Sequence, residues 1–151
     1  GARLEPVLEA IKLYKQLGIW IEITTLIIPG MNDSEDELRQ IAEFIRDVGD
    51  EIPWHISRFH PDHKMSHINS TPTETIPKAL EIGHDAGLKY IYVGNLPGDI
   101  GENTYCYNCG ELLIKRRLFT VLENHVKYYR CYNCGVEIHG VGMWRNNPNG
   151  E

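Results

Sequence analysis

The sequence predicts a mixed α/β protein in which a parallel-sheet unit is followed by a small metal-binding ribbon. Two observations support this class. Helical and strand patterns alternate over residues 1–98, which favours βαβ units and a parallel sheet. Two near-identical cysteine pairs then follow within residues 99–151, and all four cysteines of the chain lie there. We therefore expect two units that meet between residues 98 and 99, in the stretch GNLPGDIGEN.

The first helix and the first strand are predicted from periodicity. Apolar side chains recur at helical spacing over residues 4–17, and Gly18 follows where a C-terminal cap would stand. The stretch 19–28, IWIEITTLII, is long and rich in β-branched residues, and a Pro-Gly pair follows it. This stretch predicts a strand that ends in a turn.

The remaining elements of the first unit repeat this alternation. Ser34 and Glu37 match a capping box at the start of a second helix. The stretch 54–59, WHISRF, predicts a second strand, residues 76–86 a third helix, and residues 88–93, LKYIYV, a third strand. The predicted order is therefore helix, strand, helix, strand, helix, strand.

Alternation along the first strand separates two faces. One face is apolar and suits packing against helices, whereas the other carries Glu22 and Thr24. A polar face suits the interior of a barrel that holds a ligand. The alternative is an edge strand with one solvated face. A long loop, residues 61–72, follows the second strand at the end where parallel α/β folds have their sites.

The cysteine pairs are the strongest signal in the chain. Cys106 and Cys109, and then Cys131 and Cys134, form two copies of C-Y-N-C-G with 21 residues between them. Two such turns supply four thiolates in a tetrahedron, which predicts a zinc ribbon with short strands at residues 112–114 and 119–122. A rubredoxin-like iron site and two disulfides are the alternatives. Four protein ligands leave no open position for a catalytic water, so a zinc ion here would be structural.

Charge and hydropathy limit the partners. Residues 1–100 carry 9 Lys and Arg against 16 Asp and Glu, and residues 101–151 carry 6 against 5. This balance argues against nucleic-acid binding, although the basic residues 115–117 beside Phe119 and residues 128–129 could form a small patch. No apolar run approaches the ~20 residues that cross a bilayer, and no targeting peptide begins the chain. We expect a cytoplasmic protein with no membrane partner and, since it begins with Gly, a piece of a longer one.

The motifs together resemble a known family. The chain resembles the C-terminal part of the radical SAM enzymes of the AmmeMemoRadiSam system. The resemblance rests on four stretches in this order: IEITTLIIPGMND, ISRFHPDHKM, YVGNLPG and NTYCYNCGELLI. Those enzymes are similar to pyruvate formate-lyase activating enzymes. The resemblance runs from about Leu4 to Val141. It implies the later βα units of a partial (β/α)6 radical SAM barrel, followed by a zinc ribbon.

The resemblance also implies cofactors. In the family, a C-x3-C-x2-C loop holds a [4Fe-4S] cluster that binds S-adenosylmethionine and cleaves it reductively to a 5′-deoxyadenosyl radical. This chain contains no such motif. By resemblance, Thr24 and His60 would lie near the S-adenosylmethionine and Asn95 at the rim of its cavity. Glu22 is a further candidate, which rests only on its being on the same face of the predicted strand as Thr24.

The resemblance implies a fragment of an iron–sulfur oxidoreductase or activase that is inactive by itself. Its partners would be the missing N-terminal half of the barrel and a glycyl-radical-type or AmmeMemoRadiSam-system protein substrate. The ribbon departs from the family at Tyr107 and Tyr132, positions that are often Pro. The alternative is a non-catalytic α/β–zinc-ribbon module that binds nucleic acid or a protein.

Overall fold

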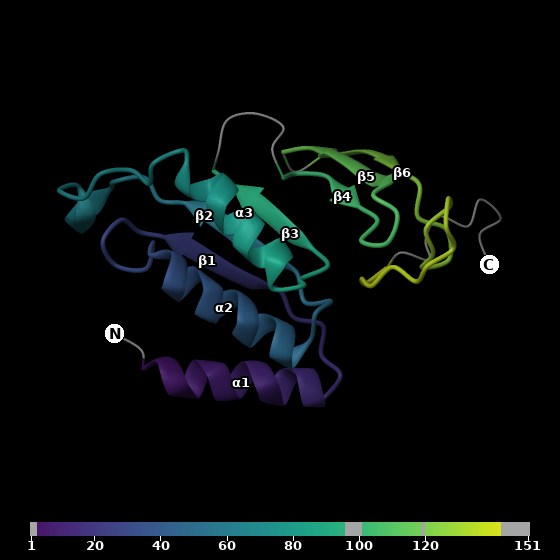
Figure 1. Ribbon diagram of the computed structural model, residues 1–151, viewed down its shortest axis with the longest axis horizontal. Helices are drawn as coiled ribbons and strands as arrows, with labels where there is room; N and C mark the ends of the chain where they lie inside the picture. The colour runs from purple at the N-terminus through teal and green to yellow at the C-terminus, as the bar shows by residue number, and fades with distance from the viewer. Residues whose placement is uncertain (1–2, 96–100, 119, 143–151) are drawn as a thin grey trace. The chain divides into compact units, whose positions relative to one another are not determined.

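The chain divides into two compact units, Gly1–Leu96 and Pro97–Glu151. The computed structural model describes residues 3–95, 101–118 and 120–142 of these units (Figure 1). The boundary predicted between residues 98 and 99 lies outside the described residues. Within the described ranges, no helix is long and apolar enough to cross a membrane.

The first unit alternates helices and strands, as predicted. Its elements are, in order, α1 (Leu4–Gln16), β1 (Ile23–Ile27), α2 (Glu35–Val48), β2 (Trp54–Arg58), the 3-10 helix η1 (His63–Met65), α3 (Thr75–Asp85) and β3 (Ile91–Gly94). The three strands form one parallel sheet in the order β1-β2-β3. The predicted mixed α/β class with a parallel sheet is therefore confirmed.

Strand β1 is shorter than the strand predicted over residues 19–28. Its ladder with β2 begins where Ile23 pairs with Trp54, and the residue before Trp54 is Pro53. Because proline has no N–H to donate, the ladder does not continue toward the start of the predicted strand. The N–H of Ile23 donates to the carbonyl of Pro53 at 2.9 Å, and this bond marks the beginning of the pairing.

Helices α2 and α3 cover the same face of this sheet. Its buried core joins side chains of both helices to alternate sheet positions: Leu38, Ala42, Ile45, Ile76, Ala79, Ile82, Ile27, Trp54, Ile56, Ile91 and Val93. The indole N–H of Trp54 donates to Thr25 Oγ1 at 2.9 Å within this core. Gly83 lets α3 approach closely, since a Cβ there would lie 2.6 Å from Cδ1 of Ile91 and 3.0 Å from the Trp54 ring.

The other face of the sheet carries mostly polar side chains, and we call it the polar face. Its members are Thr24, Leu26, His55, Ser57 and Tyr92, which alternate with the core positions along the strands. Thr24, His55 and Tyr92 are register partners and form a row across the three strands. Thr24 and Leu26 are exposed and the other three are half-buried.

The predicted N-terminal cap at the start of α2 is confirmed, although the Glu37 carboxylate accepts from the Ser34 hydroxyl and not from its backbone N–H as in a complete capping box. The N–H of Glu37 donates to Ser34 Oγ at 3.3 Å, and the Ser34 hydroxyl donates to Glu37 Oε2 at 2.6 Å. These bonds satisfy one of the four N–H groups that a helix leaves unpaired at its first turn.

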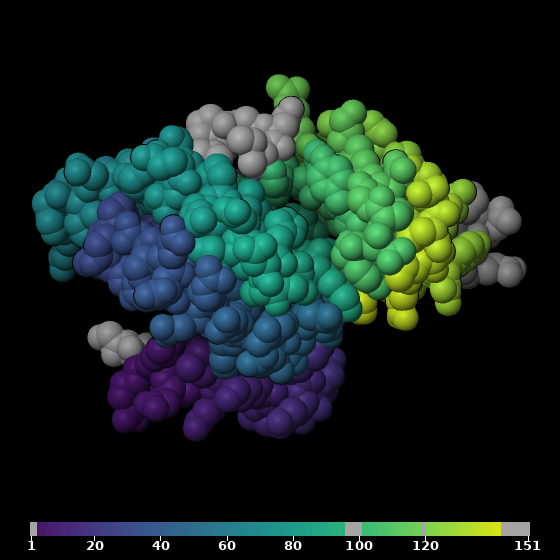
Figure 2. Space-filling model, viewed as in Figure 1, coloured from purple at the N-terminus to yellow at the C-terminus, as the bar shows by residue number. Residues whose placement is uncertain are grey.

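Helix α1 lies alongside α2 (Figure 1). Lys12 Nζ is 5.7 Å from the centre of the Phe44 ring, and Lys15 pairs with Glu51. None of the α1 side chains is fully buried, and the helix forms a broad stretch of surface in the space-filling view (Figure 2). The predicted apolar stripe of this helix therefore remains largely exposed.

The second unit is a small antiparallel sheet. Its strands are β4 (Thr104–Tyr105), β5 (Leu112–Arg117) and β6 (Thr120–Asn124), in the order β4-β5-β6. Both predicted strand regions are therefore strands, although Phe119 lies outside the described residues. The buried side chains of Leu113, Ile114, Val126 and Ile138 form the small apolar interior of the unit. So little apolar surface makes the cysteine cluster important to its stability.

Candidate functional site

The two cysteine turns have the same backbone geometry, and we call them the first knuckle (residues 106–110) and the second knuckle (residues 131–135). In the first, the N–H of Gly110 donates to the Cys106 carbonyl at 2.8 Å; in the second, the N–H of Gly135 donates to the Cys131 carbonyl at 2.9 Å. Both glycines have φ +74°, a conformation that side chains with a Cβ rarely adopt. The repeated sequence therefore builds a repeated turn that aims two sulfurs in one direction.

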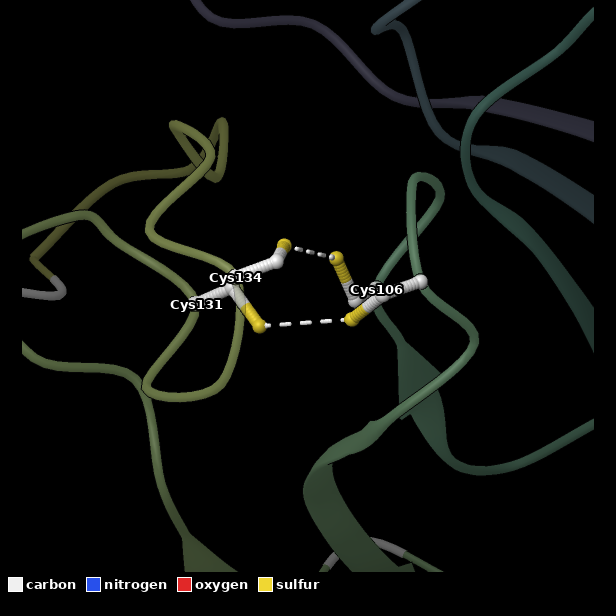
Figure 3. Close-up of side chains that lie close together, drawn as sticks. Cys106, Cys131 and Cys134 are labelled. Atoms are coloured by element: carbon white, nitrogen blue, oxygen red, sulfur yellow. Dashed lines mark hydrogen bonds between the residues drawn. The ribbon is translucent and has the colours of Figure 1, made fainter.

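The four sulfurs face one another across the knuckles (Figure 3). All four Sγ atoms of Cys106, Cys109, Cys131 and Cys134 lie within 4.8 Å of one another. Cys106 Sγ is 3.6 Å from Cys134 Sγ, and Cys109 Sγ is 3.7 Å from Cys131 Sγ. A tetrahedron with metal–sulfur bonds of ~2.3 Å has edges of about 3.8 Å, whereas a disulfide needs ~2.05 Å. The cluster therefore fits a metal ion, and all four cysteines are free of disulfides.

The cysteines differ in burial and in acidity. Cys106 and Cys131 are buried, whereas Cys109 and Cys134 are exposed. Burial raises the pKa of the Cys106 thiol to about 12. The backbone N–H of Val136, followed by the side chain of Asn108, lowers the pKa of Cys134 to about 6. Because a metal ion binds thiolates, it must displace the Cys106 proton, whereas Cys134 is already ionised at neutral pH.

Tyr107 and Tyr132 link the knuckles to each other. The Tyr107 hydroxyl donates to the carbonyl of Glu137 at 3.1 Å, beyond the second knuckle. A side-chain hydrogen bond with Glu111 raises the pKa of Tyr132 to about 12, and Glu111 follows the first knuckle. Each tyrosine thus forms a hydrogen bond with a residue that follows the other knuckle, and proline, which has no side-chain hydroxyl, cannot form this bond.

Beside the polar face, Glu22, which precedes β1, meets His55, a contact that the sequence does not reveal. Glu22 Oε2 lies 2.8 Å from His55 Nε2, and the indole N–H of Trp20 donates to Glu22 Oε1 at 3.1 Å. The His55 ring stacks on the Tyr92 ring with 5.2 Å between centroids. The sequence predicts Glu22 and Thr24 on one polar face, and the structure adds His55 and Tyr92 to the same region. Strand parity could have found them, since both lie at alternate positions to core residues.

His60 and Asn95 meet at the carboxyl end of the sheet. His60 Nε2 is 3.4 Å from the Asn95 carbonyl oxygen, and Asn95 Nδ2 donates to the Arg58 carbonyl at 3.3 Å. Asn95 has φ +59°, in the left-handed region that asparagine tolerates best after glycine. Thr24 lies farther back along the strands, beside His55 in the register. The candidates therefore form two groups on the first unit, one around His55 and one at the strand ends.

A buried threonine positions the loop that follows β2. Thr71 is fully buried, and its hydroxyl donates to the Ile27 carbonyl at 2.6 Å. The same oxygen accepts the N–H of Phe59 at 2.9 Å, and the Thr71 carbonyl accepts from Arg58 Nε at 2.6 Å. The loop of residues 60–70, which begins at His60, is thereby closed onto the ends of β1 and β2. Sequence reasoning missed Thr71 because no local pattern marks it.

The basic residues of β5 are engaged within the second unit. Lys115 pairs with Glu123 at 3.0 Å. The guanidinium of Arg116 donates to Thr104 Oγ1 at 2.6 Å and to the Glu102 carbonyl at 3.3 Å. Two of the basic side chains of the predicted patch are therefore bonded to groups of the same unit. Phe119, which the prediction also included, lies outside the described residues.

The chain is similar to the uncharacterized protein MJ0808 of Methanocaldococcus jannaschii. The two are 51% identical over 140 residues, which cover 91% of this chain and 42% of the relative. The chain therefore spans about two fifths of the length of the curated relative that it matches. No protein-family model matches the chain, and no solved structure matches it.

Proposed function

We propose that this chain is the C-terminal part of a radical SAM iron–sulfur enzyme similar to the pyruvate formate-lyase activating enzymes. The observation that carries the proposal is a parallel sheet, in the order β1-β2-β3, whose helices α2 and α3 cover the same face. Parallel sheets normally have helices on both faces, whereas the strands of a barrel turn one face inward. On this proposal, β1, β2 and β3 are later strands of a partial (β/α)6 barrel and the polar face is its interior.

The places of the motifs support the proposal. IEITTLIIPGMND runs through β1 into the turn that follows it, and ISRFHPDHKM runs from β2 into η1. Both motifs therefore end beyond the carboxyl ends of neighbouring parallel strands. Parallel α/β folds and barrels place their ligands at this edge.

The residues of this edge and of the polar face would bind S-adenosylmethionine. His60 and Asn95 would hold its ribose at the strand ends, while Glu22 and Thr24 would line the interior beside His55. In the complete enzyme, the cofactor and a [4Fe-4S] cluster supply a 5′-deoxyadenosyl radical. The four cysteines of this chain do not suit such a cluster, because it uses three cysteines and leaves one iron open, whereas sulfur–sulfur distances of 3.6 and 3.7 Å fit four ligands around a single ion. The cluster ligands would therefore lie in another part of the protein.

In the second unit, we propose a structural zinc ion held by the four cysteines. The sulfur–sulfur distances of 3.6 and 3.7 Å and the paired knuckles support a tetrahedral four-thiolate site. Purified protein should contain one zinc per chain by elemental analysis, and Cys106→Ser should release it. A red protein with iron and a reversible one-electron couple would instead support electron transfer.

The function is tested on the product of the complete gene. We expect a C-x3-C-x2-C motif upstream of Gly1 and, after anaerobic purification and reduction with dithionite, release of 5′-deoxyadenosine from S-adenosylmethionine. Thr24→Val should lower this release, whereas Thr73→Val, which changes an exposed threonine before α3, should not. A gene that begins near Gly1, or a product that leaves S-adenosylmethionine intact, would favour the binding-module alternative.

The chain by itself should not cleave S-adenosylmethionine. After reconstitution with iron and sulfide, it should give no 5′-deoxyadenosine above a control without protein, because its cysteines belong to the ribbon. Weak binding of S-adenosylmethionine should still shift the amide NMR signals of Thr24, His60 and Asn95. Shifts confined to the knuckles would count against the proposed place of the cofactor.

A further inference from the structure

Two asparagines make a reciprocal pair of contacts across the cysteine cluster. Asn108 Nδ2 donates to Cys134 Sγ at 3.6 Å, and Asn133 Nδ2 donates to Cys109 Sγ at 3.6 Å. Each asparagine is the residue just before the second cysteine of its own knuckle, and each reaches the second cysteine of the other. The contacts therefore follow the same twofold repeat as the knuckles.

The two sulfurs that receive these bonds are the exposed ones. Cys109 and Cys134 face solvent, whereas Cys106 and Cys131 are buried. Four thiolates around a divalent ion leave a net charge of about −2, and exposed thiolates are where a proton or a competing chelator first reaches the site. An N–H donor disperses the charge on a thiolate and fixes its direction, as hydrogen bonds to metal ligands generally do.

Because each asparagine donates to a cysteine of the other knuckle, the two bonds connect the knuckles to each other. A donor on the same turn would stabilise each knuckle separately. A crossed donor holds the two knuckles together, and the Tyr107 bond to the Glu137 carbonyl adds to this link. The four sulfurs are thereby kept near the corners of one tetrahedron, which lowers the entropy lost when a metal ion binds.

We infer that Asn108 and Asn133 are positioning residues of the metal site, each of which retains the metal by holding the exposed thiolate of the opposite knuckle. The inference rests on the proposed four-cysteine metal site and goes beyond it, because it assigns metal retention to two side chains that do not touch the ion. Loss of either asparagine opens the site from its solvent side.

The test compares Asn108→Leu, Asn133→Leu and the double variant with the unchanged chain. Transfer of zinc to a chelating dye should be about 10-fold faster in each single variant, since changes to such outer hydrogen bonds typically cost 10–100-fold in metal affinity. The double variant should be faster still. In the cobalt-substituted protein, the thiolate-to-cobalt charge-transfer band should move to lower energy in each variant.

Tyr107→Phe is the matched control. It removes a hydrogen bond between the knuckles but no donor to sulfur, so zinc transfer should accelerate less and the cobalt band should stay in place. Asn108→Asp keeps the shape of the side chain and places an acceptor beside the Cys134 thiolate, so its effect should exceed that of Asn108→Leu. Variants that bind cobalt with unchanged band energy and unchanged zinc transfer would overturn the inference. An unchanged chain that takes up neither metal would overturn the metal site itself.

Discussion

Substitution of Thr71 by valine should destabilise the first unit strongly, although the two side chains have nearly the same volume. The Thr71 hydroxyl is fully buried and serves two backbone groups, the Ile27 carbonyl at 2.6 Å and the Phe59 N–H at 2.9 Å. Valine would keep the packing but leave both groups without this partner. An unsatisfied buried donor costs about 1–3 kcal/mol and a lost acceptor bond about 1 kcal/mol. We therefore expect a loss of about 2–4 kcal/mol in the free energy of unfolding.

Urea unfolding of a chain in which Trp20 and Trp144 are replaced by Phe, so that the fluorescence reports the buried Trp54, measures this loss. The midpoint should fall without a change in the slope, because the same surface is exposed on unfolding. For a unit of this size, a loss of about 3 kcal/mol corresponds to a melting temperature lower by roughly 12–24 °C.

Thr71→Ser separates the hydroxyl from the methyl group. It keeps both hydrogen bonds and removes one buried methyl, so it should cost only about 1 kcal/mol. If Thr71→Val is as stable as the unchanged chain, or Thr71→Ser is less stable than Thr71→Val, the hydrogen bonds of the Thr71 hydroxyl do not stabilise the ends of β1 and β2.

Three further predictions concern single groups. Gly83→Ala should destabilise the first unit by about 1–3 kcal/mol in the same urea assay, because the new Cβ would collide with the buried Trp54 and Ile91; an unchanged or higher midpoint would show that α3 can move away. Ser34→Ala should lower stability by about 1 kcal/mol through loss of the α2 cap, while Ser34→Asp, which can still accept the N–H, should not. In metal-free protein, iodoacetamide should label Cys134 before Cys106 at neutral pH, and the Cys134 rate should level off above pH 6, because its pKa is lowered to about 6 whereas that of Cys106 is raised to about 12. Peptide mass spectrometry measures the order, and equal labelling of the two would contradict it.

Local patterns in the sequence determine the order of the elements and the cysteine site. The capping box at Ser34 and the repeated C-Y-N-C-G turns act over a few residues, so they can be read without knowledge of the rest of the chain. The same holds for the polar side of β1, because alternation follows directly from strand geometry. These features predicted the mixed α/β class and the four-cysteine cluster that the structure contains.

Pairing between distant segments was decided only by the tertiary structure. Pro53, which precedes β2, sets the residue at which β1 begins, because it cannot donate a hydrogen bond to an earlier residue of that strand. The register of β1 with β2 brings Glu22 close to His55, which lies 33 residues later in the sequence. The burial of Thr71 depends on the ends of two strands meeting at one loop. The crossed bond from Asn108 to Cys134 requires the two knuckles to face each other. None of these contacts has a local signature, because strand register and the approach of distant turns depend on packing of the whole unit rather than on the propensities of neighbouring residues.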